Sequence, residues 1–107
     1  MLYMIIGRDV RNSLEDVRNS LERRLAVRPA HLERLQALQA QGRLVLAGPL
    51  PALDSPDPGP AGFLGSLIVA EFDSLSDARD WAEVDPYATH GVFTEVEVLP
   101  FKKVLPA

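Results

Sequence analysis

The sequence has no cysteine, so disulfides and thiolate chemistry are excluded. It also lacks a long hydrophobic run. The apolar start at residues 1–6 is too short for the core of a signal peptide, and no later run approaches the roughly 18 residues of a membrane-spanning helix. We therefore expect a cytoplasmic protein with no membrane partner.

Basic residues are scarce outside one region. Residues 8–43 hold eight arginines and five acids, whereas residues 54–97 hold ten acids and one arginine, within a net charge of −4. Aromatic residues do not interleave with the basic region, as they do in many nucleic-acid-binding surfaces. We therefore expect no nucleic-acid partner.

Length and composition indicate one soluble domain over residues 1–107. The chain is 47% hydrophobic and 24% charged, which is ordinary for a globular protein. A chain of this size can bury roughly two-thirds of the surface that it exposes when unfolded. No disulfide or metal is needed to stabilise it.

The order of apolar patterns predicts an α+β fold. Four segments are typical of strands: Leu2–Ile6, which Gly7 is expected to end, Leu44–Gly48, Ser66–Phe72 and Val92–Leu99. Helices are predicted from Pro29 to about Gln41 and from a Ser74 cap to about Val84. The resulting order is the ferredoxin-like βαββαβ arrangement with an antiparallel sheet.

Two segments fall outside these elements. The heptad at residues 9–15 is repeated at once at residues 16–22, and we interpret it as an insertion in a surface connection, with a short helical turn from Ser13 or Ser20 to Leu25 and no chemical role. Residues 49–65 are rich in proline and glycine. They predict an irregular loop that folds over a cleft as a wall or lid.

The strand patterns also predict a second copy of the chain. Two helices can cover only one face of a four-stranded sheet, whereas three of the strands are apolar on both faces. The second face must then be hidden from water. A homodimer about a two-fold axis would hide it.

His31 is the most unusual residue of the first helix. Counting about 100° per residue, it falls inside the arc of Leu35 and Leu38 and therefore faces the interior. If Pro29 begins the helix, His31 lies in its first turn, where the helix dipole and burial favour a neutral imidazole that can accept a proton. The alternative is a core histidine that is hydrogen-bonded to a backbone carbonyl.

The chain resembles the YciI-like (YCII-related) family over nearly its whole length. The resemblance rests on Tyr3, Arg28-Pro29-Ala30-His31-Leu32, Gly42-Arg43-Leu44, Ala47-Gly48-Pro49, Gly65-Ser66, Asp85-Pro86-Tyr87, Gly91-Val92-Phe93 and Pro100-Phe101-Lys102. It implies a dimeric α+β barrel of ferredoxin-like subunits. It also implies a His–Asp pair in a cleft, proposed to be catalytic, which the motifs place at His31 and Asp85. One branch of the family resembles dehydrochlorinases of chlorinated hydroxyquinols, and the duplicated heptad departs from the family pattern.

A carboxylate beside a histidine suits proton transfer, because it fixes the tautomer and stabilises the imidazolium. Without the resemblance, Asp85 is simply a helix cap before Pro86. The cap and the His–Asp pair can coexist only if the carboxylate has an oxygen beyond the one that makes the cap hydrogen bond. Ser66 is a candidate donor to a substrate oxygen, although a serine at this position more often merely begins a strand. Tyr87 is a candidate wall of the cleft, although packing in the core is the more common role of such a ring. His90 is either a second acid–base group or a surface histidine.

Other site classes are poorly matched. His31, His90 and Asp85 lack the paired spacing of metal ligands, and the glycines of residues 59–65 precede a strand rather than a phosphate-binding helix. We expect no metal and no cofactor. The sequence therefore favours a small cofactor-independent enzyme, lyase-like or isomerase-like, that acts on a small cyclic metabolite. The alternative is a non-enzymatic dimer that binds a small ligand or another protein.

Overall fold

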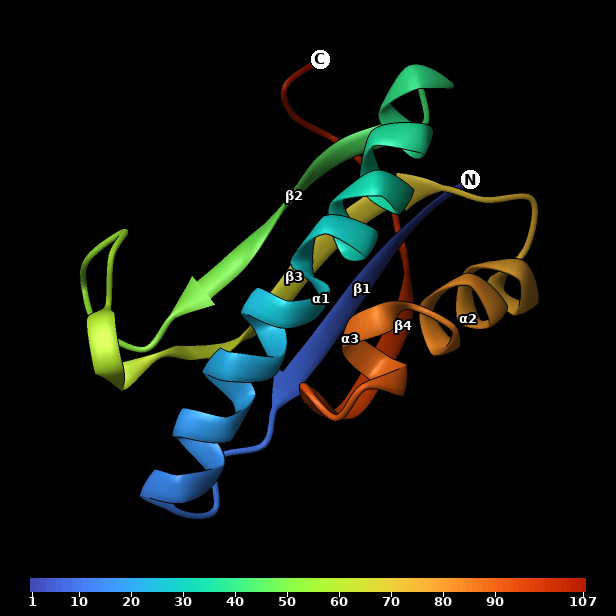
Figure 1. The fold of residues 1–107 in the computed structure, drawn as a ribbon. Coiled ribbons are helices and arrows are strands. Elements are labelled where there is room, and N and C mark those ends of the chain that lie inside the picture. The colour runs from blue at the N-terminus through green and yellow to red at the C-terminus, as the bar shows by residue number, and fades with distance from the viewer.

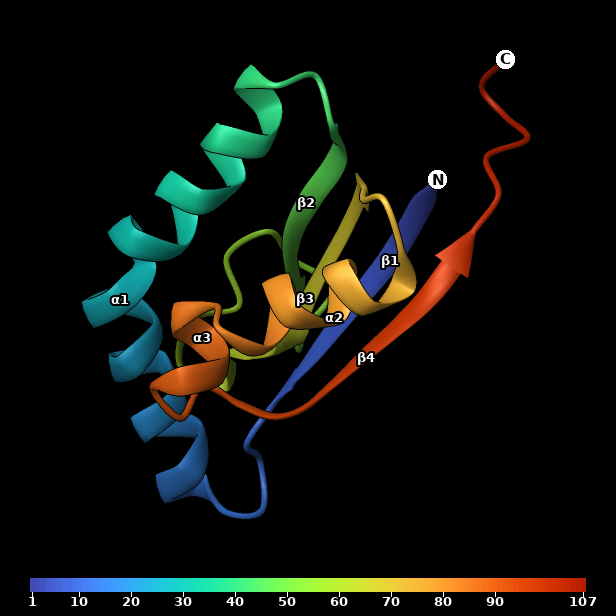
Figure 2. The same ribbon diagram turned by 90° about the vertical axis from the view of Figure 1, so that its right-hand side faces the viewer.

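The computed structural model describes residues 1–107 and contains one four-stranded sheet. Its elements are β1 (Leu2–Asp9), α1 (Leu14–Ala40), β2 (Leu44–Pro51), the short 3₁₀ helix η1 (Gly59–Ala61), β3 (Phe63–Glu71), α2 (Leu75–Glu83), α3 (Pro86–Thr89) and β4 (Phe93–Phe101). The strand order is β2-β3-β1-β4, and all neighbours are antiparallel. The three α-helices lie on one side of the sheet (Figures 1 and 2). The predicted ferredoxin-like α+β fold is confirmed.

The hydrophobic core lies between the helices and the inner face of the sheet. Alternate residues of the central strands point toward the helices, and α1 contributes Leu35 and Leu38 to the same layer. The buried cluster consists of Tyr3, Ile5, Leu35, Leu38, Ile68, Ala70, Phe72, Ala78, Ala82 and Val98. The predicted interior face of the first helix is therefore confirmed.

The first helix is much longer than predicted. It begins after Ser13, whose hydroxyl accepts a hydrogen bond from the backbone of Asp16 at 3.1 Å, and it continues through Pro29 to Ala40. An interior proline costs roughly 3 kcal/mol because a helical hydrogen bond is lost. Here the carbonyl that loses its partner belongs to Leu25, which is 74% exposed and open to water. His31 therefore lies in the middle of α1, and the expected effect of the helix dipole does not apply.

The duplicated heptad forms the end of β1, the following turn and the first turns of α1. Its first copy, residues 9–15, ends β1, turns and begins α1, whereas its second copy, residues 16–22, is entirely helical. Asp9 of the first copy and Ser20 of the second are both buried. The predicted short helical turn to Leu25 is too short, because the second copy continues without a break into the rest of α1. Burial, which local repetition does not encode, gives the two copies different environments.

Several strands extend beyond their predicted ends. β1 continues through Gly7, where the Phe93 ring occupies the space of a side chain. β2 includes Pro49 and Pro51, which an edge strand tolerates because its outer side needs no hydrogen-bond donors. The irregular loop is consequently residues 52–62 rather than 49–65. The predicted caps are confirmed, since Ser74 accepts from Asp77 N at the start of α2 and Asp85 accepts from Tyr87 N at the start of α3.

The face of the sheet away from the helices is also apolar. The strand register places one set of large hydrophobic residues on it, and Leu46, Leu99 and Phe101 are 49%, 43% and 37% exposed. The full set is Leu2, Met4, Ile6, Leu46, Leu67, Val69, Leu99 and Phe101. We refer to these eight residues as the outer apolar face.

Candidate active site

His31 and Asp85 are brought together from distant parts of the chain. His31 projects from the middle of α1, and Asp85 is the N-cap residue of α3. The imidazole Nδ1 lies 2.8 Å from Oδ2 of Asp85, and both side chains are buried. The contact predicted from the resemblance is present, whereas its catalytic role remains a proposal.

The carboxylate of Asp85 is fully engaged. Its Oδ2 accepts hydrogen bonds both from the backbone N–H of Tyr87 at 3.0 Å and from His31, so a single oxygen serves the cap and the pair. Its Oδ1 accepts from Nη1 of Arg34 at 3.0 Å. Arg34 is held in turn by the carbonyl of Trp81 at 2.8 Å and by the Trp81 ring, 4.1 Å from its guanidinium carbon. These contacts fix the orientation of the carboxylate.

The second imidazole nitrogen of His31 is available to a ligand. Nε2 has no hydrogen-bond partner in the protein, and no fully buried side-chain polar atom of the protein lacks one. Nε2 is therefore reachable from outside the protein interior. One face of the ring stacks on Tyr87, with centroids 3.9 Å apart and planes inclined by 11°. The imidazole thus has a fixed orientation and one free nitrogen.

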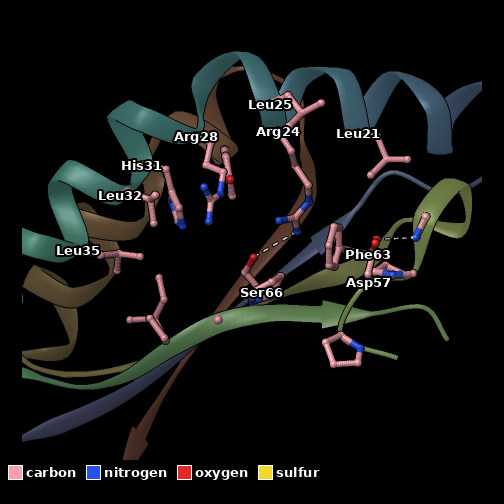
Figure 3. A pocket seen from close by; sticks show the side chains of 18 residues that line it. Leu21, Arg24, Leu25, Arg28, His31, Leu32, Leu35, Asp57, Phe63 and Ser66 are labelled. Carbon is pink, nitrogen blue, oxygen red and sulfur yellow. Dashed lines mark hydrogen bonds between the residues drawn. The ribbon is translucent and has the colours of Figure 1, made fainter. Parts of the chain in front are cut away.

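A cavity of about 560 Å³ adjoins this nitrogen. It lies between α1, the inner face of β2 and β3, and the loop of residues 52–62 (Figure 3). His31, Ser66 and Tyr87 line it together with leucines of α1 and the ring of Phe63. Its size is typical of pockets that bind small organic molecules.

The loop of residues 52–62 forms one wall of the cavity through Pro56, Asp57, Pro58 and Gly59. Arg11 fixes its end, because Nη1 of that residue donates to the carbonyls of Ala61 at 3.0 Å and Phe63 at 3.1 Å. The interpretation of this region as a wall therefore agrees with the structure. The first heptad copy contributes Arg11 and so supports this wall.

A second buried polar cluster surrounds Arg24. Its Nε and Nη2 each lie 2.7 Å from an oxygen of Asp9, and Ser20 donates to the same carboxylate at 2.7 Å. The guanidinium also lies 5.0 Å from the Phe63 ring centroid and 4.9 Å from that of Tyr87. The contacts of Arg24 are not among the features predicted from the sequence. Spacing offered a signal, since Arg24 and Arg28 precede His31 by seven and three residues and share its helical face.

Ser66 is positioned by this cluster. Nη2 of Arg24 donates to the Ser66 hydroxyl oxygen at 3.2 Å. The hydroxyl proton of Ser66 has no acceptor in the protein, and the residue lines the cavity. It is therefore free to donate to a ligand oxygen, the role for which the sequence makes it a candidate.

Tyr87 lines the cavity between the two clusters. Burial raises the pKa of its phenol above the usual value of 10.0, and Asp85 acts in the same direction. Arg24 and Arg28 oppose this rise in the pKa. The raised pKa keeps the phenol neutral at physiological pH.

His90 lies apart from the cavity. It is exposed at the end of α3, where its Nδ1 contacts Oγ1 of Thr89 at 2.9 Å and the carbonyl of Pro86 at 3.2 Å. The interpretation of His90 as a surface histidine therefore agrees with its position. No group of three or more His, Asp or Glu side chains is arranged to hold a metal ion, and none of the helices has the length and hydropathy needed to span a membrane.

Comparisons with known proteins agree with this architecture. The YCII-related domain matches residues 1–102. Protein YciI of Escherichia coli O6:H1 is 56% identical over 104 residues, covering 97% of this chain and 99% of that protein. An uncharacterized protein of Haemophilus influenzae is 54% identical over 90 residues, covering 84% and 92%.

Among solved structures, the chain is similar to 5-chloro-2-hydroxyhydroquinone dehydrochlorinase from Burkholderia phenoliruptrix, determined in complex with 2,5-dihydroxybenzoquinone. The TM-score is 0.73 and the sequence identity 25%. The match covers 95% of this chain and 94% of that one.

Proposed function

The chain belongs to the YCII-related family, and from this premise we propose that it is a small cofactor-independent enzyme that catalyses proton transfer on a small cyclic metabolite. One observation carries the proposal. His31 is paired with Asp85 through Nδ1, while its Nε2 is unpartnered beside a cavity of about 560 Å³. This arrangement is that of a general base with an orienting carboxylate.

The proposed mechanism follows from the tautomer. The carboxylate of Asp85 accepts from Nδ1–H, so the lone pair of His31 is on Nε2 and points to the ligand side. A substrate C–H or O–H placed there loses its proton to Nε2. The imidazolium that forms is stabilised by the adjacent carboxylate. The proton is then returned to another atom of the substrate in an isomerisation, or to solvent in an elimination.

The solved structural relative supports an elimination of this kind. Its name describes the removal of hydrogen chloride from a chlorinated ring. In such a step on a hydroxylated ring, the carbon that bears chlorine takes up a proton and the base removes a hydroxyl proton. The O–H electron pair forms a C=O bond, the ring double bond shifts toward the chlorine-bearing carbon, and chloride leaves with the C–Cl electron pair. His31 would be the base, Asp85 its partner, Ser66 a donor to a substrate oxygen and Tyr87 a wall of the site.

We propose in addition that the chain forms a homodimer through the outer apolar face. This face holds eight large hydrophobic residues that no helix covers. Exposed apolar patches of this extent in soluble proteins commonly mark interfaces, and a two-fold axis pairs the same face of each copy.

A non-enzymatic ligand-binding module is the second candidate. It is favoured by the contacts of Asp85, which caps α3 and binds Arg34 and so has a structural role whether or not chemistry occurs. In that case the His31–Asp85 contact would serve stability alone.

The experiment compares turnover of 5-chloro-2-hydroxyhydroquinone and related cyclic compounds by wild-type protein, His31→Ala and Asp85→Asn. Asparagine retains the helix cap but not the negative charge. We expect each variant to lose about 100-fold or more in turnover while remaining folded. His90→Ala is the matched control, because that histidine lies outside the cavity, and it should retain full activity.

The same variants separate the two candidates. Full activity in both His31→Ala and Asp85→Asn would contradict the mechanism. The structural role would instead be supported if His31→Ala lowered the melting temperature by several degrees and neither the wild-type protein nor the variants turned over any compound. A catalytic pair predicts little change in melting temperature, or a gain.

A further inference from the structure

One face of α1 presents three nitrogen-bearing side chains to the cavity. Arg24, Arg28 and His31 are four and three residues apart, which places them on successive turns of the same helical face (Figure 3). With a rise of about 1.5 Å per residue, Arg28 lies about 6 Å along the axis from Arg24 and about 4.5 Å from His31. Arg28 is therefore the neighbour of the proposed base.

Arg24 is not available to bind a ligand anion. Two of its nitrogens are held at 2.7 Å by the carboxylate of Asp9, and both side chains are buried. Its charge is neutralised within the protein. Arg24 contributes to the site by orienting the hydroxyl of Ser66 through a hydrogen bond.

Arg28 differs from Arg24 in having no partner. It forms no ion pair and no side-chain hydrogen bond with the protein, although it lines the cavity. Asp57 also lines the cavity, but it caps its own loop by accepting from Gly59 N at 3.2 Å and does not pair with Arg28. Arg28 is therefore an unpaired cation at the edge of the site.

We infer that Arg28 binds the anionic oxygen of the ligand, so that the substrate class is a small planar organic anion with an apolar body. The inference rests on the proposed function for the identity of the reacting group. A guanidinium recognises a carboxylate or an ionised enol or phenol through charge-assisted hydrogen bonds. Leu21, Leu25, Leu32 and Phe63 provide the apolar walls for the rest of the ligand.

This assignment also has a chemical consequence. Removal of a proton by His31 leaves extra negative charge on the substrate, and a fixed cation one helical turn away stabilises that charge as it develops. The anionic oxygen on Arg28 and the hydroxyl of Ser66 would orient the ring across the cavity. The proton would be taken from an atom close to the anionic group.

Binding of simple probes tests the inference without requiring turnover. Benzoate, 4-nitrophenolate and the neutral benzamide are titrated by calorimetry into wild-type protein, Arg28→Met and Arg18→Met. Arg18 is the matched control, since it is exposed on α1 and does not line the cavity. We expect at least one anionic probe to bind wild-type protein and Arg18→Met equally, and Arg28→Met about ten- to a hundredfold more weakly.

Benzamide should bind weakly and to the same extent in all three proteins. Preference for benzoate or for 4-nitrophenolate identifies the ligand anion as carboxylate or phenolate. The inference is overturned if no anionic probe binds the wild-type protein, if Arg28→Met binds as tightly as wild type, or if benzamide binds as tightly as the anions.

The variant His31→Ala separates this inference from the proposed function, because it should keep anion binding while losing turnover. Anion binding that depends on Arg28, with turnover that does not depend on His31, would contradict the proposed function alone. Turnover that depends on His31, with binding indifferent to Arg28, would contradict this inference alone.

Discussion

The rings of His31 and Tyr87 lie face to face, with centroids 3.9 Å apart and planes inclined by 11°. Tyr87 follows Asp85 by two residues, so the short helix α3 supplies both the carboxylate that binds the imidazole and the ring on which it rests. The short helix α3 and its N-cap residue therefore set the orientation of the His31 ring.

The pKa of Tyr87 is raised, chiefly by burial, and this can be measured directly. The chain has two tyrosines, so the variant Tyr3→Phe leaves Tyr87 as the only one. We expect its absorbance at 295 nm to titrate with a midpoint above 10.0 in the folded protein. A midpoint at or below 10.0 would contradict the burial of the phenol.

The same shift predicts a loss of stability in alkali. A raised pKa means that the folded state holds the phenol proton more tightly than the unfolded state, so the stabilisation is complete below pH 10.0 and disappears as the pH rises through the higher folded pKa. The free energy of unfolding in urea should therefore fall more steeply above pH 10.0 in wild-type protein than in Tyr87→Phe. Equal slopes in the two proteins would count against the prediction.

The buried pair Asp9–Arg24 should show strong coupling. Their side chains are 2% and 7% exposed. Removing one partner leaves a buried charge and typically costs about 3–5 kcal/mol, whereas replacing both with apolar residues costs much less than the sum. We predict this for Arg24→Met, Asp9→Leu and the double variant, measured by chemical denaturation.

The exposed pair Arg8–Glu95 is the matched control for this cycle. Arg8 precedes Asp9 on β1 and faces Glu95 on β4, at a distance of 3.1 Å and with exposed fractions of 53% and 64%. Its coupling should be below about 1 kcal/mol. Similar coupling in the two pairs would mean that Arg24 is not buried as described.

Two glycines beside the site allow close contacts, Gly65 between β3 and β1 and Gly7 between β1 and the ring of Phe93. A Cβ on Gly65 would overlap the carbonyl oxygen of Gly7, and a Cβ on Gly7 would overlap the Phe93 ring. We expect Gly65→Ala and Gly7→Ala each to lower the free energy of unfolding by about 1–3 kcal/mol. Gly48→Ala, which has open space around the new atom, should change it by less than about 0.5 kcal/mol.

The proposed homodimer predicts that a charge on the outer apolar face separates the subunits. Leu99 is 43% exposed on that face, so Leu99→Lys should fold but be monomeric at micromolar concentration by light scattering. Leu53→Lys, in the loop and 57% exposed, should leave the wild-type dimer intact. A wild-type protein that is itself monomeric would refute the proposal.

Much of the fold could be predicted from local patterns. Apolar alternation located the four strands, Ser74 and Asp85 were recognised as caps, and helical spacing placed His31 on the same face as Leu35 and Leu38. These features depend on residues close together in the chain. Strand ends were less accurate, because the prolines of β2 are tolerated only at a sheet edge, which is a tertiary property.

The candidate site was predicted only in part. The pairing of His31 with Asp85 came from a family resemblance, since nothing local indicates that residues 54 positions apart will meet. Arg34 on the same carboxylate and the cluster around Arg24 were missed, because an arginine on a helix is ordinarily solvated. Their partners, Asp9 and Asp85, stand at the end of a strand and the start of a helix, where only the folded chain brings them to α1.

The duplicated heptad shows most clearly which features local sequence patterns determine and which depend on tertiary packing. The sequence by itself determined the alternation of strands and helices, because periodicity and capping act over a few residues. It did not determine the structure of residues 9–15 and 16–22, which are identical in sequence yet differ in structure. Only tertiary packing decided that Asp9 ends a strand while Asp16 lies in a helix, because Asp9 pairs with the buried guanidinium of Arg24, whereas Asp16 lies in the first turn of α1.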